Sequence, residues 1–284
     1  MEIHIVIGTG IVFRTISLGH YEARPNGNLN GVVLWAHLGY VLQRNNRIGF
    51  QIAAKFGFNG CVANLRQTSD GVLVCAHDDG FIGNDSNTYN ISEHTYSEIE
   101  NTIGYNFGTS SRDNGNYYAN ILEDKHLVTV EEFLYICATT GMLPKFSVRY
   151  DVNWNTFKTL LIRFGFYGNG KCTLVHNSTF YRIIRENALP VLGDNVRYCI
   201  EYTSGSETMD IALTQATALG NVPILIEPVS KATWTQEEVD TIVNAGYIPS
   251  AAPDFTTFNK YEEFIKLGIR EFTVNEIANV CIGV

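Results

Sequence analysis

The chain has 284 residues, of which 45% are hydrophobic and 17% charged, and its formal net charge is −9. This composition is typical of a packed globular protein and excludes a disordered or fibrous chain. No run of basic residues is present that would follow a phosphate backbone, so nucleic acid is not expected as a partner. A small phosphorylated ligand remains compatible with the net negative charge of the chain. One or two arginines in a closed pocket attract a phosphate at short range more strongly than a diffuse negative surface repels it.

The cysteines and the first residues carry no targeting or metal signal. The six cysteines include no CxxC pair, and we interpret them as core residues. The opening segment MEIHIVIGTG lacks a basic region and is too short for a membrane span, so it fits neither a signal peptide nor a transmembrane helix. We expect a soluble chain, and its location and oligomeric state stay unknown.

Short β-branched and aromatic runs alternate with amphipathic stretches from residue 31 onwards, which is the rhythm of repeated β-α units. Eight strands are predicted, and eight is the number that closes a barrel. Such barrels commonly have about 250 residues, so one domain accounts for the length. The predicted strands are 32–38, 60–67, 143–149, 172–177, 196–202, 222–228, 247–252 and 270–275.

Helices are predicted between these strands, and their ends carry recognisable signals. Thr129 with Glu132, and Thr235 with Glu238, fit capping boxes at helix starts. Several stretches end in a glycine, which a helix C-terminus favours because the residue there is left-handed. The predicted helices include 46–57, 129–140, 154–164, 209–219, 235–245 and 257–267.

Two segments fall outside the repeat. Residues 1–30 are interpreted as an N-terminal arm of unknown role, and residues 31–284 as the α/β TIM barrel. Residues 104–127, rich in Asn, Gly, Tyr and Ser, read as a long loop that could act as a lid over the site.

Catalytic groups of such barrels come from the carboxyl ends of the strands, where two histidines stand out. His37 ends the first strand. The second strand is followed by a TSDG turn and a returning strand that ends at His77. The turn predicts a hairpin that brings His77 back towards His37, and two imidazoles can share acid and base roles near neutral pH. Each histidine could instead only cap its strand end.

This pattern resembles the glycerophosphodiester phosphodiesterase family. The first strand of that family ends in His-Arg-Gly, its second carries Glu-x-Asp before a Thr-Lys-Asp-Gly turn, and its returning strand ends in His-Asp. The resemblance covers about residues 31–276 in the same order. The matching segments here are His37-Leu38-Gly39, Val62-Ala63-Asn64, Thr68-Ser69-Asp70-Gly71, His77-Asp78, Val130-Glu131-Glu132, Phe146-Ser147-Val148-Arg149, and Gly268 to Asn275.

The resemblance implies that His37 and His77 are catalytic, but the metal positions of the family are altered. A divalent cation such as Ca²⁺ or Mg²⁺ is held in the family by acids that align with Val62, Asn64 and Ser147. Hard cations need charged oxygen ligands, which these three side chains do not supply. We therefore predict no metal at these positions and no cofactor. The family's Arg and late Asp also become Leu38 and Asn275.

Arg66 and Arg149 are the candidate replacements for the missing positive charge. Strand alternation points both to the same side as Asn64 and Ser147, and a guanidinium binds phosphate bidentately. Bacterial phosphatidylinositol-specific phospholipases C, which resemble this barrel, use an arginine near the usual metal position. Both arginines are equally compatible with salt bridges at the barrel mouth.

The remaining acidic and histidine residues allow further interpretations. Asp78 is taken as substrate-binding; Asp78 and Asp79 could also orient a histidine or cap the next turn. His176, Glu201 and Glu227 lie near strand ends and could form a relocated cation site, although no spacing specifies one.

Two functions follow. The first is a phosphoric diester hydrolase of the glycerophosphodiester phosphodiesterase type, with a small phosphodiester as its substrate and a histidine pair that works without metal or with impaired activity. The second is an inactive module on the same barrel that binds a phosphodiester or a glycan. We favour the enzyme, and the sequence leaves the leaving alcohol open.

Overall fold

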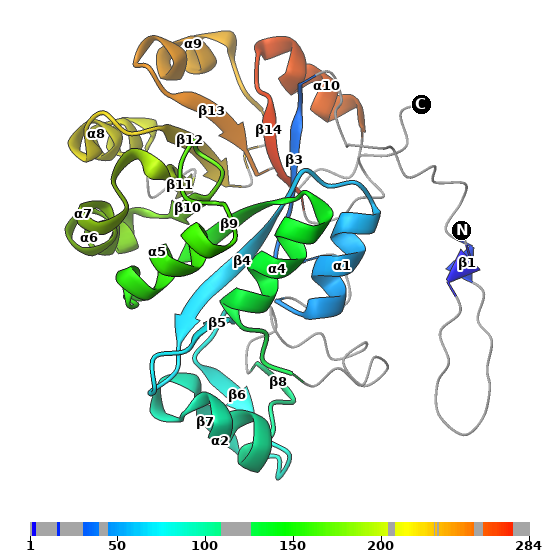
Figure 1. Ribbon diagram of the computed structural model, residues 1–284. Coiled ribbons are helices and arrows are strands. Elements are labelled where there is room, and N and C mark those ends of the chain that lie inside the picture. The colour runs from blue at the N-terminus through cyan, green and yellow to red at the C-terminus, as the bar shows by residue number, and fades with distance from the viewer. Residues whose placement is uncertain are drawn as a thin grey trace.

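The computed structural model describes residues 2–3, 16–17, 31–39, 45–108, 126–203, 208–229, 231, 233–252 and 258–274. Eight parallel strands form a closed barrel, because the first barrel strand pairs with both the last and the second (Figure 1). All eight predicted strands and the TIM barrel are confirmed. In sheet order the strands are β3 (Val33–Ala36), β14 (Glu271–Val274), β13 (Ile248–Ala251), β12 (Ile224–Val229), β11 (Arg197–Thr203), β10 (Thr173–His176), β9 (Leu143–Val148) and β4 (Gly60–Gln67).

Helices pack around the outside of the barrel (Figure 1). The capping boxes of Thr129 with Glu132 and of Thr235 with Glu238 are both formed. Gly141 ends its helix in the left-handed conformation, as its position predicts. The six predicted helices correspond to α1 (Arg47–Lys55), α4 (Val130–Thr140), α5 (Trp154–Arg163), α8 (Met209–Leu219), α9 (Gln236–Asn244) and α10 (Phe258–Leu267).

A further helical run follows β10 and was not among the predicted helices. It changes helix type several times, and Pro190 lies near the start of its last α-helical turn. Proline donates no backbone hydrogen bond, so the regular helical pattern is broken there. The run consists of η3 (Ser178–Phe180), α6 (Tyr181–Ile183), η4 (Ile184–Ala188), α7 (Leu189–Leu192) and η5 (Gly193–Asn195).

The predicted hairpin after β4 is confirmed and leads into an excursion below the barrel in Figure 1. β5 (Leu73–Cys75) returns antiparallel to β4. The excursion has its own small apolar core, which includes Phe81 and Ile99. Its elements are β6 (Gly80–Ile82), β7 (Thr88–Asn90), η1 (Ile91–Glu93), α2 (Tyr96–Glu98), η2 (Ile99–Ile103) and β8 (Phe107–Gly108).

Some sequence predictions fall largely outside the described residues. Residues 109–125 of the expected lid are among these, as are Cys281 and Asn275. The arm before residue 31 contributes only the pair β1 (Glu2–Ile3) and β2 (Ile16–Ser17), so the domain boundary stays a prediction. The five described cysteines are buried free thiols, as expected of core residues. Within the described ranges no helix is both long and apolar enough to cross a bilayer.

His126 joins the excursion to the barrel. Its Nδ1 lies 2.6 Å from Glu100 of η2, and its Nε2 lies 3.0 Å from Glu132 of α4. The hydrogen bonds to Glu100 and then Glu132 raise the pKa of His126 to about 10, against the opposing effect of burial. The imidazole is therefore charged near neutral pH and is held by two carboxylates.

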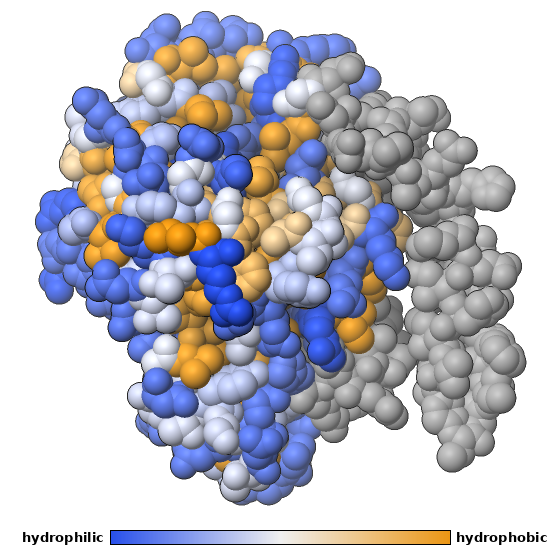
Figure 2. Space-filling view, in the orientation of Figure 1, coloured by the Kyte–Doolittle hydropathy of each residue, from blue (hydrophilic) through white to orange (hydrophobic). Residues whose placement is uncertain are grey.

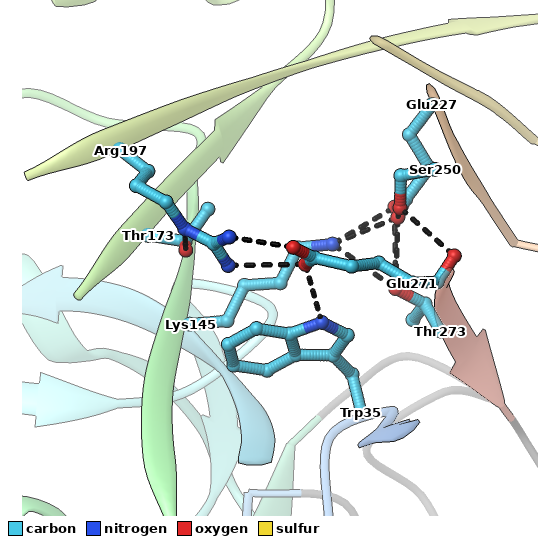
Figure 3. Close-up of polar contacts among 8 residues, drawn as sticks. All are labelled: Trp35, Lys145, Thr173, Arg197, Glu227, Ser250, Glu271 and Thr273. Carbon is cyan, nitrogen blue, oxygen red and sulfur yellow. Dashed lines mark hydrogen bonds and ion pairs between the residues drawn. The ribbon is translucent and has the colours of Figure 1, made fainter. Parts of the chain in front are cut away.

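The barrel interior contains a buried polar network (Figure 3). Lys145 on β9 donates to both carboxylate oxygens of Glu227 on β12, at 3.0 and 2.9 Å, and to Thr273. Ser250 donates to the same carboxylate at 2.6 Å. Glu271 accepts from Arg197 and from the Trp35 indole. Strands that are not neighbours in the sheet are thus joined across the interior through charged groups.

Lys145 and Glu227 are both fully inside the protein, at 1% and 0% side-chain exposure. Burial acts to lower the pKa of Lys145, but neighbouring anionic groups, including Glu227, raise it above its ordinary value. Burial acts to raise the pKa of Glu227, and Lys145 with its hydrogen-bonding neighbours lowers it. Both groups are therefore charged, and each depends on the other.

We predict that Lys145→Met destabilises the fold by about 3–5 kcal/mol, because it leaves a buried carboxylate without its cation. The double variant Lys145→Met/Glu227→Met should be more stable than Lys145→Met alone, since no unpaired charge remains. Urea unfolding followed by far-UV circular dichroism measures the free energy of unfolding of each variant.

The matched control is the exposed pair of Arg163 and Glu131, whose ionic groups lie 2.7 Å apart on the outer helices. Arg163→Met should cost about 1 kcal/mol or less. If Lys145→Met costs no more than Arg163→Met, the interior pair does not stabilise the barrel.

Candidate active site

His37 and His77 both follow strands at the carboxyl end of the barrel. His37 comes directly after β3, and its backbone N–H donates to Val274 at the end of β14. His77 follows the returning strand β5, where the N–H of Ala76 donates to the carbonyl of Asn64 on β4. β3 and β4 are parallel neighbours, so the two histidines lie at the same end of the barrel. That their rings reach one ligand stays a prediction.

Asp78 and Asp79 have separate partners. The Nδ1 of His77 lies 2.6 Å from Oδ1 of Asp78, so Asp78 orients the imidazole and leaves Nε2 as its other ring nitrogen. Asp79 instead accepts from the backbone N–H and the hydroxyl of Ser92 in the excursion, at 3.0 and 2.5 Å. Asp78 thus makes the orienting contact considered for these aspartates, whereas Asp79 binds the excursion 13 residues later.

Arg66 binds the segment that carries His77 and Asp79. Its Nε and Nη2 donate to the carbonyl of His77 at 3.2 and 2.8 Å. Its Nη1 lies 3.6 Å from the carboxylate of Asp79. The guanidinium carbon lies 3.7 Å from the centre of the Tyr150 ring. Arg66 is buried, with its side chain 5% exposed.

Arg149 differs from Arg66. It follows the last residue of β9 and continues the inward alternation of Lys145 and Ser147. The residue is half-buried, and its guanidinium makes no hydrogen bond or ion pair to another described residue. Of the two candidate arginines, Arg149 is the one with its donors available.

Asn64, which the resemblance aligns with the second metal position, forms a pair of amides with Asn45. The side-chain N–H of Asn45 donates to Oδ1 of Asn64 at 3.1 Å, and the backbone N–H of Asn64 donates to Oδ1 of Asn45 at 2.9 Å. Asn45 has a left-handed φ of 56°, a conformation that asparagine tolerates better than most residues. Ser147 lies in register beside Asn64. No pattern in the sequence indicates the role of Asn45.

Val62, which the resemblance aligns with the first metal position, lies in an apolar cluster. Val62 packs with Trp35 and Leu38, and all three are buried. Leu38 stands where the family has arginine, at a φ of 58°, which is costly for a bulky side chain. Gly39, also left-handed, approaches α1 so closely that a Cβ would lie 3.2 Å from the backbone of Gly49. The His37 turn is therefore packed tightly onto the first helix.

These residues do not fit the divalent cation that the family resemblance implies. Val62 has no donor atom, the Asn64 oxygen accepts from Asn45, and Ser147 offers only a neutral hydroxyl. Throughout the described ranges no three acidic, cysteine or histidine side chains form a group that could hold a metal ion.

The relocated cation site considered for His176, Glu201 and Glu227 is contradicted. Val175 packs inside the barrel with Cys199 and Leu225, so His176 points to the opposite face of β10, where its ring lies 5.9 Å from that of Tyr181. Glu227 lies inside the barrel and is bound to Lys145. The barrel wall separates the two side chains.

A groove of about 590 Å³ lies elsewhere, between α1, α4 and α5. Its walls include Arg47, Gln51, Tyr135 and Arg163, and none of the candidate site residues. Hydrophilic and hydrophobic residues are mixed over this outer face in small patches (Figure 2). The groove is therefore not part of the candidate site.

Comparisons with known proteins reveal similarity of structure only. No protein-family model matches the sequence, and no curated protein matches it either. Solved structures with a similar fold include three from bacteria whose sequence identity to this chain is low.

A glycerophosphodiester phosphodiesterase from Agrobacterium tumefaciens has a TM-score of 0.68 at 14% identity, over 88% of this chain and 99% of that one. A phosphodiesterase from Oleispira antarctica, in complex with its product sn-glycerol-3-phosphate, has a TM-score of 0.65 at 14% identity, over 90% and 98%. A glycerophosphoryl diester phosphodiesterase from Parabacteroides distasonis has a TM-score of 0.62 at 16% identity, over 92% and 87%. The chain has the barrel fold of these proteins.

We predict that the wild-type protein binds neither calcium nor magnesium at the positions of Val62, Asn64 and Ser147, because none of these three side chains is a carboxylate. The variant Val62→Glu/Asn64→Asp/Ser147→Glu should be less stable than wild type without metal, since three carboxylates repel one another, and calcium should raise its melting temperature. Adding Asn45→Gly should increase that rise, because glycine accepts the positive φ and frees the side chain at position 64.

Melting curves with calcium and with a chelator measure both effects, and the control is the wild type in the same two solutions. Micromolar calcium binding to wild type by calorimetry, abolished by Asn64→Ala, would show that a metal site has been overlooked.

We also predict a pH dependence from His176, which is 1% exposed. Burial lowers its pKa from 6.5 to about 4. Below pH 6.5 the unfolded chain binds a proton at this residue that the folded protein does not bind until about pH 4. This contribution to stability is therefore complete above pH 6.5 and is lost between pH 6.5 and 4, at up to about 1.4 kcal/mol per pH unit.

The free energy of unfolding, measured by urea denaturation from pH 7 to 4, should fall less steeply in His176→Phe than in wild type. His176→Leu is the second variant, and it should behave in the same way. A constant difference between variant and wild type over this range would contradict the assignment.

Proposed function

We propose that the protein is a phosphoric diester hydrolase of the glycerophosphodiester phosphodiesterase type that works without a bound divalent cation. The observation that carries the proposal is His77, oriented by Asp78 at the carboxyl end of a barrel strand that neighbours the strand of His37. The fold of the similar structures supports it, since these proteins are phosphodiesterases.

His77 is the general base in this proposal. Asp78 holds the Nδ1 side of the ring, so Nε2 accepts the proton from the hydroxyl next to the phosphodiester, and Asp78 stabilises the imidazolium that results. The hydroxyl oxygen attacks phosphorus, and the bond from phosphorus to the leaving alcohol breaks. His37 donates a proton to that alcohol. The product is a cyclic phosphate, which water opens with the roles of the two histidines reversed.

Arg149 supplies positive charge to the phosphate. Stabilising the charge that develops on the phosphoryl oxygens is usually the largest contribution to catalysis. Arg149 has its donors available and lies beside Ser147, where the family holds its cation. A guanidinium can take two phosphate oxygens at once.

The test is hydrolysis of glycerophosphoglycerol, glycerophosphocholine and a cyclic glycerophosphate, each with and without chelator. We expect activity that the chelator leaves unchanged. His37→Asn and His77→Asn should each lower kcat by about 10²–10⁴-fold, because each removes a proton-transfer group. Arg149→Gln should weaken binding of inorganic phosphate and lower kcat/KM, whereas Arg149→Lys should recover part of both.

Arg182→Gln is the matched control, because it makes the same charge change on an arginine that is 84% exposed. If wild type hydrolyses none of the substrates yet binds phosphate in a manner that depends on Arg149, the inactive binding module is the correct function. If wild type neither hydrolyses these substrates nor binds phosphate, its resemblance to the phosphodiesterases is limited to the fold.

A further inference from the structure

We infer that Arg66 is a positioning residue for His77, and that Tyr150 holds the Arg66 guanidinium in place. This inference rests on the proposed function, since it assigns the reacting group to His77. It differs from the substrate-binding role that the sequence suggested for Arg66.

The first argument is the use of the Arg66 donors. Nε and Nη2 converge on one acceptor, the carbonyl oxygen of His77, and Nη1 faces the carboxylate of Asp79. These partners are both backbone and side-chain groups of the segment that carries the reacting histidine. A phosphate could use Arg66 only by displacing them.

The second argument is access. One face of the guanidinium is covered by the Tyr150 ring at 3.7 Å, and the Arg66 side chain is 5% exposed. Tyr150 itself is 46% exposed and lies at the carboxyl end of β9. A planar cation stacked on an aromatic ring is held in one orientation, which fixes the direction of its N–H groups. The arrangement suits a fixed support and leaves little surface for a ligand.

The third argument is that the segment of residues 76–79 is held at both of its ends. Its N-terminal side is bound to β4 through Ala76 and Asn64, and its C-terminal side is bound to the excursion through Asp79 and Ser92. Arg66 acts between these two anchors. Its Nη1 faces Asp79, while Asp78 is the carboxylate that pairs with the His77 ring.

The experiment compares Arg66→Gln with Arg149→Gln. Arg66→Gln should lower kcat on the order of 10²-fold, because a small displacement of a reacting group has that effect. Its KM and its affinity for inorganic phosphate should stay within about twofold of wild type, as expected when no ground-state contact is lost. Arg149→Gln should instead weaken phosphate binding. If Arg66→Gln weakens phosphate binding as much as Arg149→Gln does, Arg66 is a ligand and the inference is overturned.

A second readout does not depend on turnover. The ring nitrogens of His77, followed by NMR, should report one dominant tautomer in wild type and a changed or exchange-broadened signal in Arg66→Gln. Among the described residues, Asp78 contacts that ring, Arg66 and Asp79 bind the segment that carries it, and His37 and Arg149 lie at the neighbouring strand ends. An unchanged His77 signal in Arg66→Gln would refute the positioning role, even if wild type proves inactive and the proposed function fails.

If Arg66→Gln does not fold, variants of Tyr150 test the same inference. Tyr150→Phe retains the stacked ring, while Tyr150→Ala removes it at a half-exposed position. Tyr150→Ala should change the NMR signal of His77 in the same direction as Arg66→Gln. Tyr150→Phe should leave that signal as it is in wild type. Equal behaviour of the two variants would refute the role of the ring.

Discussion

The ion pair of Lys145 and Glu227 is the interaction on which the barrel interior depends. It joins β9 to β12 across the inside of the barrel, and Thr273 and Ser250 bring two more strands to the same carboxylate. Because each charge is satisfied by the other, neither Lys145 nor Glu227 remains as an unpaired charge below the site. The same alternation that turns Lys145 inwards also turns Ser147 inwards and directs position 149 to the mouth.

At the mouth above this network, the three positions at which the resemblance implies acids are occupied by Val62, Asn64 and Ser147. An amide pair and an apolar cluster take those positions, and both are internally satisfied. A neutral, packed surface of this kind requires no cation to hold it together, whereas a group of carboxylates would. In the proposed function, the positive charge for a phosphate therefore comes from side chains, and Arg149 is assigned that role.

Much of the fold could be predicted from the sequence, because the barrel repeats one pattern. Apolar strands such as 60–67 and capping boxes such as Thr129 with Glu132 are local signals, and the structure agrees with them. The helical run around Pro190 gave no regular period, and the excursion around Phe81 is built from very short strands. In both places tertiary packing outweighs local propensity.

The candidate site was less predictable, because side-chain partners do not follow from spacing. The hairpin turn indicated that His77 returns to the mouth, and strand alternation indicated which way Arg66 points. Neither could reveal that Arg66 would bind the carbonyl of His77, or that Asn45 would reach Asn64 from a segment 19 residues earlier. Such contacts depend on how the turn after β3 packs against α1, which no local pattern encodes.

The proposed function requires a site that works without a metal, and such a site depends more strongly on the order of its own side chains. In a cation-dependent site the ion fixes its ligands and the phosphate together, whereas here each group has to be held by the protein. His77 is held at three levels: by Asp78 at its ring, by Arg66 at its carbonyl, and by Asp79 and Ser92 through the excursion. The excursion in turn is tied to the barrel by His126 between two glutamates. Local opening of that contact would release the segment that carries His77, so the stability of the excursion and the geometry of the proposed base are linked.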